Sequence, residues 1–189
     1  MARAKRYTKH IFCLEGNWEQ DLRDKSSILS ALVFMKQNFG IDYIYKQCGT
    51  KENLQYYLNQ WKLRKYSAYS IGYLSFHGFP GSIQVGKEHL YLEELAEMME
   101  DSCRDKIIHF GSCLTLDIEH RKILRFLDKT GALCVCGYRS EINFLESTVF
   151  DMLLMDLFQQ YKEVSVLKRK IFSDYRFLTR ALEFKMVHL

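Results

Sequence analysis

The sequence lacks the segments that would anchor it in a membrane or divide it into modules. Its apolar stretches are far shorter than the roughly 20 residues that span a bilayer. The basic start, residues 1–9, leads into a strand-like pattern rather than the apolar segment of a signal peptide. No Pro-, Gly- or Ser-rich linker interrupts the 189 residues. We therefore expect one soluble, cytoplasmic domain over residues 1–189, with a basic arm at residues 1–9 and no membrane partner.

Signatures of nucleotide and metal binding are also missing. The chain contains neither GxxxxGK[ST] nor GxGxxG, the glycine-rich loops that cradle phosphates. Cys134 and Cys136 come nearest to a metal motif, but no CxxC or HxxxH accompanies them. Alternation along a strand would place both sulfurs on one buried face, which favours packing. The sequence predicts neither a metal ion nor an organic cofactor.

Cysteines and charge limit the cellular setting and the partners. The six cysteines are scattered, and several fall inside apolar runs, which favours reduced thiols in a reducing compartment. Residues 1–9 and 162–189 each carry a net charge of +4, so the segment between them carries −4. Basic ends of this kind are more often solvated surfaces than nucleic-acid sites, so nucleic acid is not an expected partner.

What the chain does contain is an alternation of strand-like and helix-like patterns. Strands are expected at residues 10–14, 41–45, 67–76, 106–110 and 132–136, helices at 26–39, 51–63, 92–99, 117–127 and 144–161, and a hairpin at 83–91. The β–α–β–α–β start implies right-handed crossovers and a parallel sheet. The tail, residues 162–189, repeats apolar residues at helical spacing and predicts one amphipathic helix. The pattern is that of an α/β fold.

Two of the strand-like runs end in a reactive side chain beside a glycine. The first ends in His77-Gly78 and the second in Gly111-Ser112-Cys113. Because the ends of parallel strands meet at one edge of an open sheet, His77 and Cys113 should lie together. An imidazole can take the proton of a nearby thiol, and the thiolate is the competent nucleophile. The backbone amides of Gly78 and Cys113 could then face a developing oxyanion.

The order of these motifs resembles the caspase-like cysteine peptidases, the group of caspases, gingipains and CHAT-domain peptidases. In that group one apolar strand ends in His-Gly, and the next core strand ends in a small residue followed by Cys. Residues 132–138 and 141–154 are similar to the strand, loop and helix that follow the cysteine in CHAT domains. The resemblance covers residues 10–160. It implies a three-layer α/β/α sandwich with a mostly parallel, caspase-like sheet.

The resemblance also implies a function. The chain would be a hydrolase, a cysteine endopeptidase with His77 as general base and Cys113 as nucleophile, acting on a protein or peptide. About 18 residues separate Cys113 from the next strand, which leaves no room for the long cleavable linker of caspases. A compact CHAT-like layout therefore fits better than one activated by internal cutting.

The substrate pocket in such peptidases lies between the end of the first strand, the cysteine strand and the loop after the fifth strand. Those segments offer Glu15, Ser112, Arg139 and Glu141 as substrate-binding candidates. A carboxylate such as Glu15 would favour Lys or Arg in the substrate, whereas Arg139 would favour an acidic residue. The acidic body, together with the position of Glu15 at a strand end, gives a weak preference for cleavage after a basic residue. Gly111 stands where metacaspases carry Asp, so that acidic pocket element is absent.

Two other hypotheses stay open. A non-catalytic caspase-like module, or regulatory pseudo-peptidase, would bind a regulatory protein partner through the tail helix or an edge strand. A doubly wound binding domain with chance His and Cys residues would bury Cys113 as an inert, small apolar side chain. The peptidase hypothesis instead requires a thiol that is accessible and selectively reactive.

Overall fold

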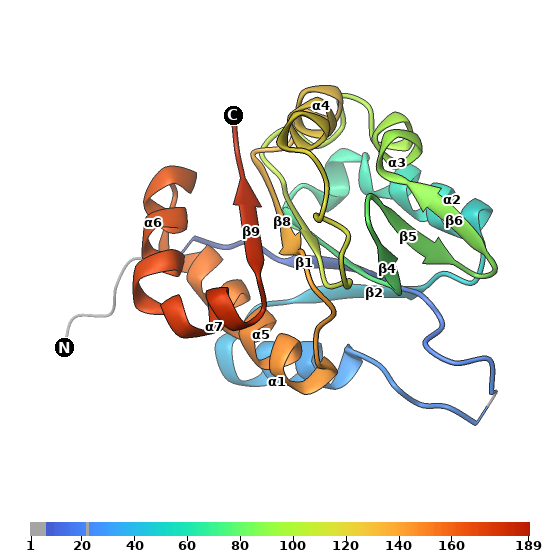
Figure 1. Ribbon diagram of the computed structural model, residues 1–189, viewed down its shortest axis with the longest axis horizontal. Coiled ribbons are helices and arrows are strands. Elements are labelled where there is room, and N and C mark those ends of the chain that lie inside the picture. The colour runs from blue at the N-terminus through green and yellow to red at the C-terminus, as the bar shows by residue number, and fades with distance from the viewer. Residues whose placement is uncertain (1–6, 22) are drawn as a thin grey trace.

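The computed structural model describes residues 7–21 and 23–189, and in this part of the chain a six-stranded sheet forms the centre. The strands lie in the order β2 (Tyr43–Gln47), β1 (Ile11–Glu15), β3 (Ile71–Ser75), β7 (Ile107–Phe110), β8 (Cys134–Tyr138) and β9 (Phe184–Val187). All neighbouring pairs are parallel except β8 and β9 (Figure 1). Residues 1–6 of the expected basic arm lie outside the described residues.

Helices cover both faces of this sheet. They are α1 (Leu29–Phe39), α2 (Lys51–Trp61), α3 (Leu92–Met98), α4 (His120–Thr130), α5 (Phe144–Gln160), α6 (Val164–Asp174) and α7 (Arg176–Ala181), with a short 3-10 helix at Arg64–Tyr66. One hydrophobic core lies between the sheet and α2, α3 and α4, and a second between the sheet and α1, α5, α6 and α7 (Figure 1). The arrangement fits the expected layered α/β sandwich. Among the described helices, none has the length and apolar character that crossing a bilayer requires.

The central strands β1, β3, β7 and β8 are buried along their whole length because both of their faces are covered. In β1, Phe12 and Leu14 pack in the first core, while Ile11 and Cys13 pack in the second. Consecutive side chains of a strand point to opposite faces, so a parallel strand between two helical layers has no polar side. The same alternation places Cys134 and Cys136 together in the second core, as predicted.

Several helix ends agree with the sequence patterns, and one does not. Thr50 caps α2 by accepting a hydrogen bond from the Asn53 backbone N–H, and Gly40 ends α1 with φ of +69°. The expected start of α1 at residue 26 is wrong, since the helix begins at Leu29. The Ser27 hydroxyl donates to the Glu15 carboxylate, which holds the preceding residues out of the helix.

The expected hairpin forms, with one additional strand. β5 (Ser82–Val85) and β6 (Glu88–Tyr91) pair antiparallel, and β4 (Gly78–Phe79) pairs with β5 on its other side. This small sheet begins directly after His77, so it anchors the chain at the end of β3.

The tail does not form the single helix that we expected at residues 162–189. The structure has α6 and α7 separated at Tyr175, and then β9 antiparallel to β8. Glu183, with φ of +44°, turns the chain from α7 into this strand. Phe184 and Met186 point into the second core, and the backbone of β9 pairs with the edge that β8 would otherwise expose. Their period-two spacing is too short to stand out from the helical pattern before it.

We expect Phe184→Ala to lower the free energy of unfolding by about 3–5 kcal/mol. Phe184 is 5% exposed, and its ring lies against those of Tyr138, Phe150 and Phe172. Phe177→Ala is the matched control, because Phe177 is 82% exposed and its loss should cost less than about 0.5 kcal/mol. Urea unfolding followed by circular dichroism measures both variants, and equal effects would contradict a buried β9.

Candidate active site

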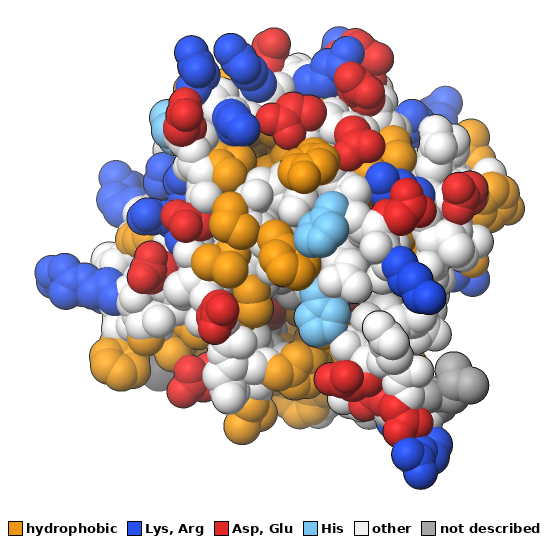
Figure 2. Space-filling model, turned by 45° about the vertical axis from the view of Figure 1, so that its right-hand side comes forward, with side chains coloured by type: hydrophobic (Ala, Val, Ile, Leu, Met, Phe, Trp, Pro, Cys, Tyr) orange, Lys and Arg blue, Asp and Glu red, His pale blue; other side chains and the backbone are white. Residues whose placement is uncertain are grey.

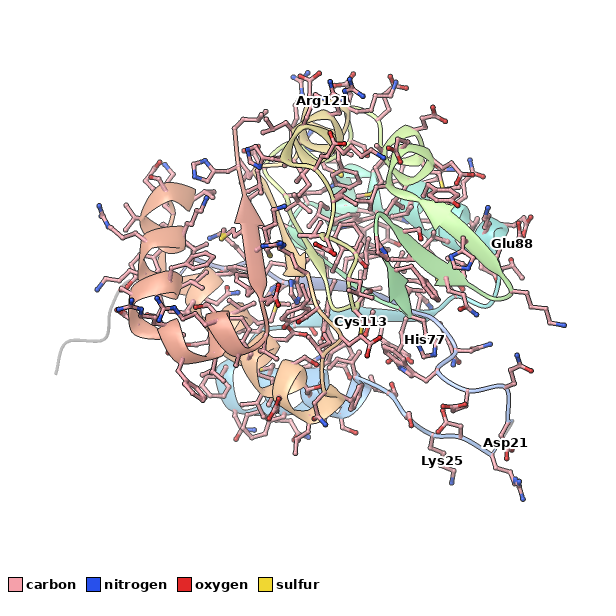
Figure 3. The ribbon with its side chains drawn as sticks, viewed as in Figure 1. Asp21, Lys25, His77, Glu88, Cys113 and Arg121 are labelled. Carbon is pink, nitrogen blue, oxygen red and sulfur yellow. The ribbon has the colours of Figure 1, made fainter. Side chains whose placement is uncertain are left out.

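The strand order reverses at β1, which pairs with β2 on one side and β3 on the other. In open α/β sheets the crevice at such a reversal, outside the carboxyl ends of the strands, is where ligands bind. His77 lies just beyond β3 and Cys113 just beyond β7, the next strand in the sheet. Figure 3 shows both residues at this same edge. The structure therefore brings together the two residues that the sequence singled out.

Backbone contacts lock the ends of β3 and β7 together. A Cβ on Gly78 would lie only 2.0 Å from the carbonyl oxygen of Cys113, so this approach requires glycine. Ser112 is buried, and its hydroxyl donates to the Leu74 carbonyl and accepts from the Phe76 N–H, each at 3.3 Å. Ser112 is thus a brace between the strands, in place of the substrate contact that we expected.

His77 is exposed and held by the backbone of Trp18. Its Nε2 lies 2.6 Å from the Trp18 carbonyl oxygen, and the two rings meet edge to face at 5.2 Å. A carbonyl oxygen only accepts, so Nε2 carries the proton of the neutral ring. The lone pair is then on Nδ1, the nitrogen that can act as a base.

Cys113 sits in a tight turn beside the loop that follows β8. Its Sγ accepts the Ile142 N–H at 3.5 Å, and the next residue, Leu114, has φ of +56° and donates to the Ser140 carbonyl. The loop after β8 therefore lies where the pocket was expected. Among the described residues, no hydrogen bond joins the His77 ring to the Cys113 sulfur. The pair is placed on neighbouring strand ends without a formed dyad contact.

All six cysteines fall within the described residues, and of these Cys113 alone is partly exposed. The other five are buried, and burial raises the pKa of each of their thiols: Cys13, Cys48, Cys103, Cys134 and Cys136. These five thiols are kept protonated and shielded. Cys113 is therefore the thiol that reagents in solution can reach.

Glu15 is buried, and four protein donors use its carboxylate. One oxygen accepts from Trp18 Nε1 at 2.7 Å and the Ile28 N–H at 2.8 Å, and the other accepts from the hydroxyls of Ser27 at 2.5 Å and Tyr45 at 2.6 Å. A carboxylate has about four lone-pair sites, so none is left for a basic substrate side chain. Burial and the Glu15 hydrogen bond raise the pKa of Tyr45 to about 12, so this phenol stays a donor. The structure gives Glu15 a positioning role in place of the predicted substrate contact.

The two charged candidates after β8 are both exposed. Arg139 Nε lies 3.6 Å from Asp117, and both side chains are about half exposed. Glu141 is exposed on the same loop. Their position beside the Cys113 turn agrees with the expectation, and their role toward a substrate stays a prediction.

The sequence analysis missed an aromatic pair that lies next to His77. The Trp18 ring, which contacts His77, also meets the Phe144 ring edge to face at 5.7 Å. Asn143 caps α5 by accepting from the N–H groups of Leu145 and Glu146, and this cap sets the position of Phe144. The cap has a recognisable sequence signal, but the approach of Trp18 to a helix so distant along the chain has none.

A buried polar network lies beneath the site. Asp151 on α5 accepts from the Tyr73 and Tyr138 hydroxyls, and its Oδ1 is 2.7 Å from His109 Nε2. A Cβ on Gly111 would lie 2.4 Å from the Tyr73 ring, so the network supports the turn that leads to Cys113. Burial and the Asp151 carboxylate raise the pKa of Tyr73 and Tyr138. Within residues 7–21 and 23–189, no group of three or more His, Cys, Asp or Glu side chains could hold a metal ion.

Comparison with known proteins places the whole arrangement in one family. A family of unknown function (DUF6642) matches residues 8–188. The chain belongs to this family. The DUF6642 match runs from before β1 to the end of β9, so it includes both strand ends of the candidate site. No curated protein matches the chain.

We expect iodoacetamide to alkylate Cys113 about tenfold faster, or more, than any other cysteine at pH 7.5. The other thiols are buried and have raised pKa values, so they react only when the fold opens. A time course analysed by peptide mapping and mass spectrometry measures all six rates. In urea the six rates should converge, and slow alkylation of Cys113 in the native protein would contradict the accessible site.

We expect Glu15→Gln to lower the free energy of unfolding by about 1.5–3 kcal/mol, since it removes a buried, charged acceptor at constant volume. Trp18 should also become more accessible to acrylamide, because its indole N–H loses a carboxylate partner. Glu141→Gln, at an exposed carboxylate, is the matched control. Fluorescence quenching measures the change over the constant signal of Trp61, which is 2% exposed. Unchanged quenching would refute the positioning role of Glu15.

Proposed function

We propose that the chain is a cysteine endopeptidase of the caspase-like type, with His77 and Cys113 as its catalytic dyad. One observation carries the proposal: the partly exposed thiol and an oriented histidine stand on adjacent strand ends whose backbones touch at Gly78. The other five thiols are buried. The strand order reverses at β1, and ligands bind at the sheet edge beside such a reversal, which also supports this location for the active site.

In the proposed mechanism His77 Nδ1 takes the proton of Cys113 when a peptide binds. Such contacts are often long in free enzymes and shorten in the complex. The thiolate attacks the scissile carbonyl carbon, so an S–C bond forms and the carbonyl oxygen becomes an oxyanion. The C–N bond then breaks as His77 returns the proton to the leaving amine, and water hydrolyses the thioester. The Trp18 carbonyl holds Nε2–H throughout and stabilises the transient imidazolium.

The turn at Cys113 is suited to stabilise the oxyanion. The backbone N–H of Cys113 donates to no other group among the described residues, so it is free to donate to a substrate oxygen. The Gly78 backbone lies against the same residue and is the second expected donor. Leu114 holds a left-handed conformation that costs a non-glycine residue about 1–3 kcal/mol. Strain of this kind concentrates at functional turns.

The substrate of the proposed enzyme is a protein or peptide, with no cofactor required. The earlier preference for cleavage after a basic residue depended on Glu15, whose lone pairs are used by protein donors. It is therefore not part of this proposal. Among the described residues, no hydrogen bond joins His77 to Cys113. This observation favours the alternative function, a non-catalytic caspase-like interaction module.

Cleavage of a mixed peptide library, read by mass spectrometry, tests the proposal. We expect wild type to cut and Cys113→Ala and His77→Ala to lose about a thousandfold or more in turnover. His120→Ala is the matched control, an exposed histidine on α4, and should cut like wild type. Thermal unfolding should show that all variants fold. Turnover retained by folded Cys113→Ala would refute the peptidase, and no cleavage by wild type would support the interaction module.

A further inference from the structure

A group of partly exposed apolar side chains lies on one side of the reactive pair. Trp18 contacts both the His77 ring and the Phe144 ring, and the Ile142 N–H meets the Cys113 sulfur. Phe144 is 46% exposed, and Leu145 beside it is 70% exposed. We call Trp18, Phe144 and Leu145 the aromatic wall, which connects the base to the loop beside the nucleophile.

A second apolar group lies at the 79–81 turn, which contacts the loop after Cys113. Phe79 is 39% exposed, and Pro80 beside it is exposed. The Gly81 N–H donates to the Thr115 carbonyl at 3.3 Å, and a Cβ on Gly81 would lie 3.1 Å from Ile118. The turn at 79–81 therefore packs on the loop that follows Cys113. Figure 2 shows hydrophobic side chains gathered on one face of the molecule, next to histidine side chains.

Three of the charged side chains around the site already have partners in the protein, whereas Glu141 is exposed. Glu15 is buried with four donors on its carboxylate. Arg139 faces Asp117 at 3.6 Å, and Lys185 donates to two carbonyl oxygens of the loop after Cys113. A charged substrate side chain that binds at Glu15, Arg139 or Lys185 would have to displace these partners. An apolar side chain would find exposed apolar surface at Phe144, Leu145 and Phe79.

We propose that this site selects peptides with an aromatic or large aliphatic side chain beside the scissile bond, an inference that rests on the proposed function. Exposed apolar surface in a cluster marks a binding site more often than isolated residues do. Burying a phenylalanine-sized side chain against such surface favours binding by about tenfold to a hundredfold. The selective element is the aromatic wall, in which Phe144 is the exposed ring.

Peptidyl chloromethyl ketones that differ only in the residue next to the warhead, Phe, Lys or Asp, test the inference. The Cys113 sulfur forms a bond to the methylene carbon, chloride leaves, and His77 takes the thiol proton. We expect the Phe probe to alkylate Cys113 about tenfold faster than the Lys and Asp probes. Phe144→Ala should slow the Phe probe about fivefold more than it slows the Lys probe. Phe34→Ala, at a 47% exposed ring on α1, is the matched control and should change neither rate.

Iodoacetamide, which carries no recognition side chain, separates the two ways to fail. If it alkylates Cys113 no faster than the buried cysteines, the peptidase proposal and this inference both fall. If Cys113 reacts selectively with iodoacetamide but the Lys or Asp probe matches the Phe probe, only the apolar class is overturned. A rate for the Phe probe that is unaffected by Phe144→Ala also overturns the inference, because the aromatic wall would then not be the selective surface.

Discussion

The buried carboxylate of Glu15 is the interaction on which the geometry of the site depends. It accepts hydrogen bonds from Trp18, Ser27, Ile28 and Tyr45, which belong to the loop after β1, the segment before α1 and strand β2. A buried charge is costly unless it is fully hydrogen-bonded, so these partners are held strictly in place. Because Trp18 in turn accepts from His77, the carboxylate controls the orientation of the proposed base without touching it.

At the edge of the sheet that carries the candidate site, the rigid strand ends and the irregular loops have different roles. The proposed base and nucleophile follow neighbouring parallel strands, braced by Ser112 and by the contact of Gly78 with Cys113, so their spacing is set by the sheet. The apolar surfaces around them belong to loops and to the first turn of α5. Recognition surfaces on loops over a rigid scaffold are common, since loops vary without disturbing the core. Leu114, which has a left-handed backbone conformation, lies where the braced strand ends give way to the irregular loops.

The sequence predicts structural features that depend on local residue patterns. It fails where contacts between residues distant along the chain determine the structure. Apolar runs and helical spacing locate the parallel strands, and the rule that such strands end at one edge brings His77 and Cys113 together. The role of Glu15 could not be read in this way, because its partners come from three segments and the same carboxylate could equally face solvent. β9 was missed since four residues carry too little periodicity against a long helical pattern. The Trp18–Phe144 contact has no local signal at all.

The start of α5 joins recognition to the nucleophile in the proposed enzyme. Asn143 fixes this helix end by its cap, and the residues on either side of it make the two contacts that matter: Ile142 with the Cys113 sulfur and Phe144 with Trp18. A peptide side chain that packs on Phe144 therefore presses on the segment whose N–H meets the sulfur. At the other end of the aromatic wall, Trp18 contacts His77 through its carbonyl oxygen and its ring. The binding of one substrate side chain would therefore act on both residues of the proposed dyad. An apolar substrate residue would thus supply the closure that the free protein lacks.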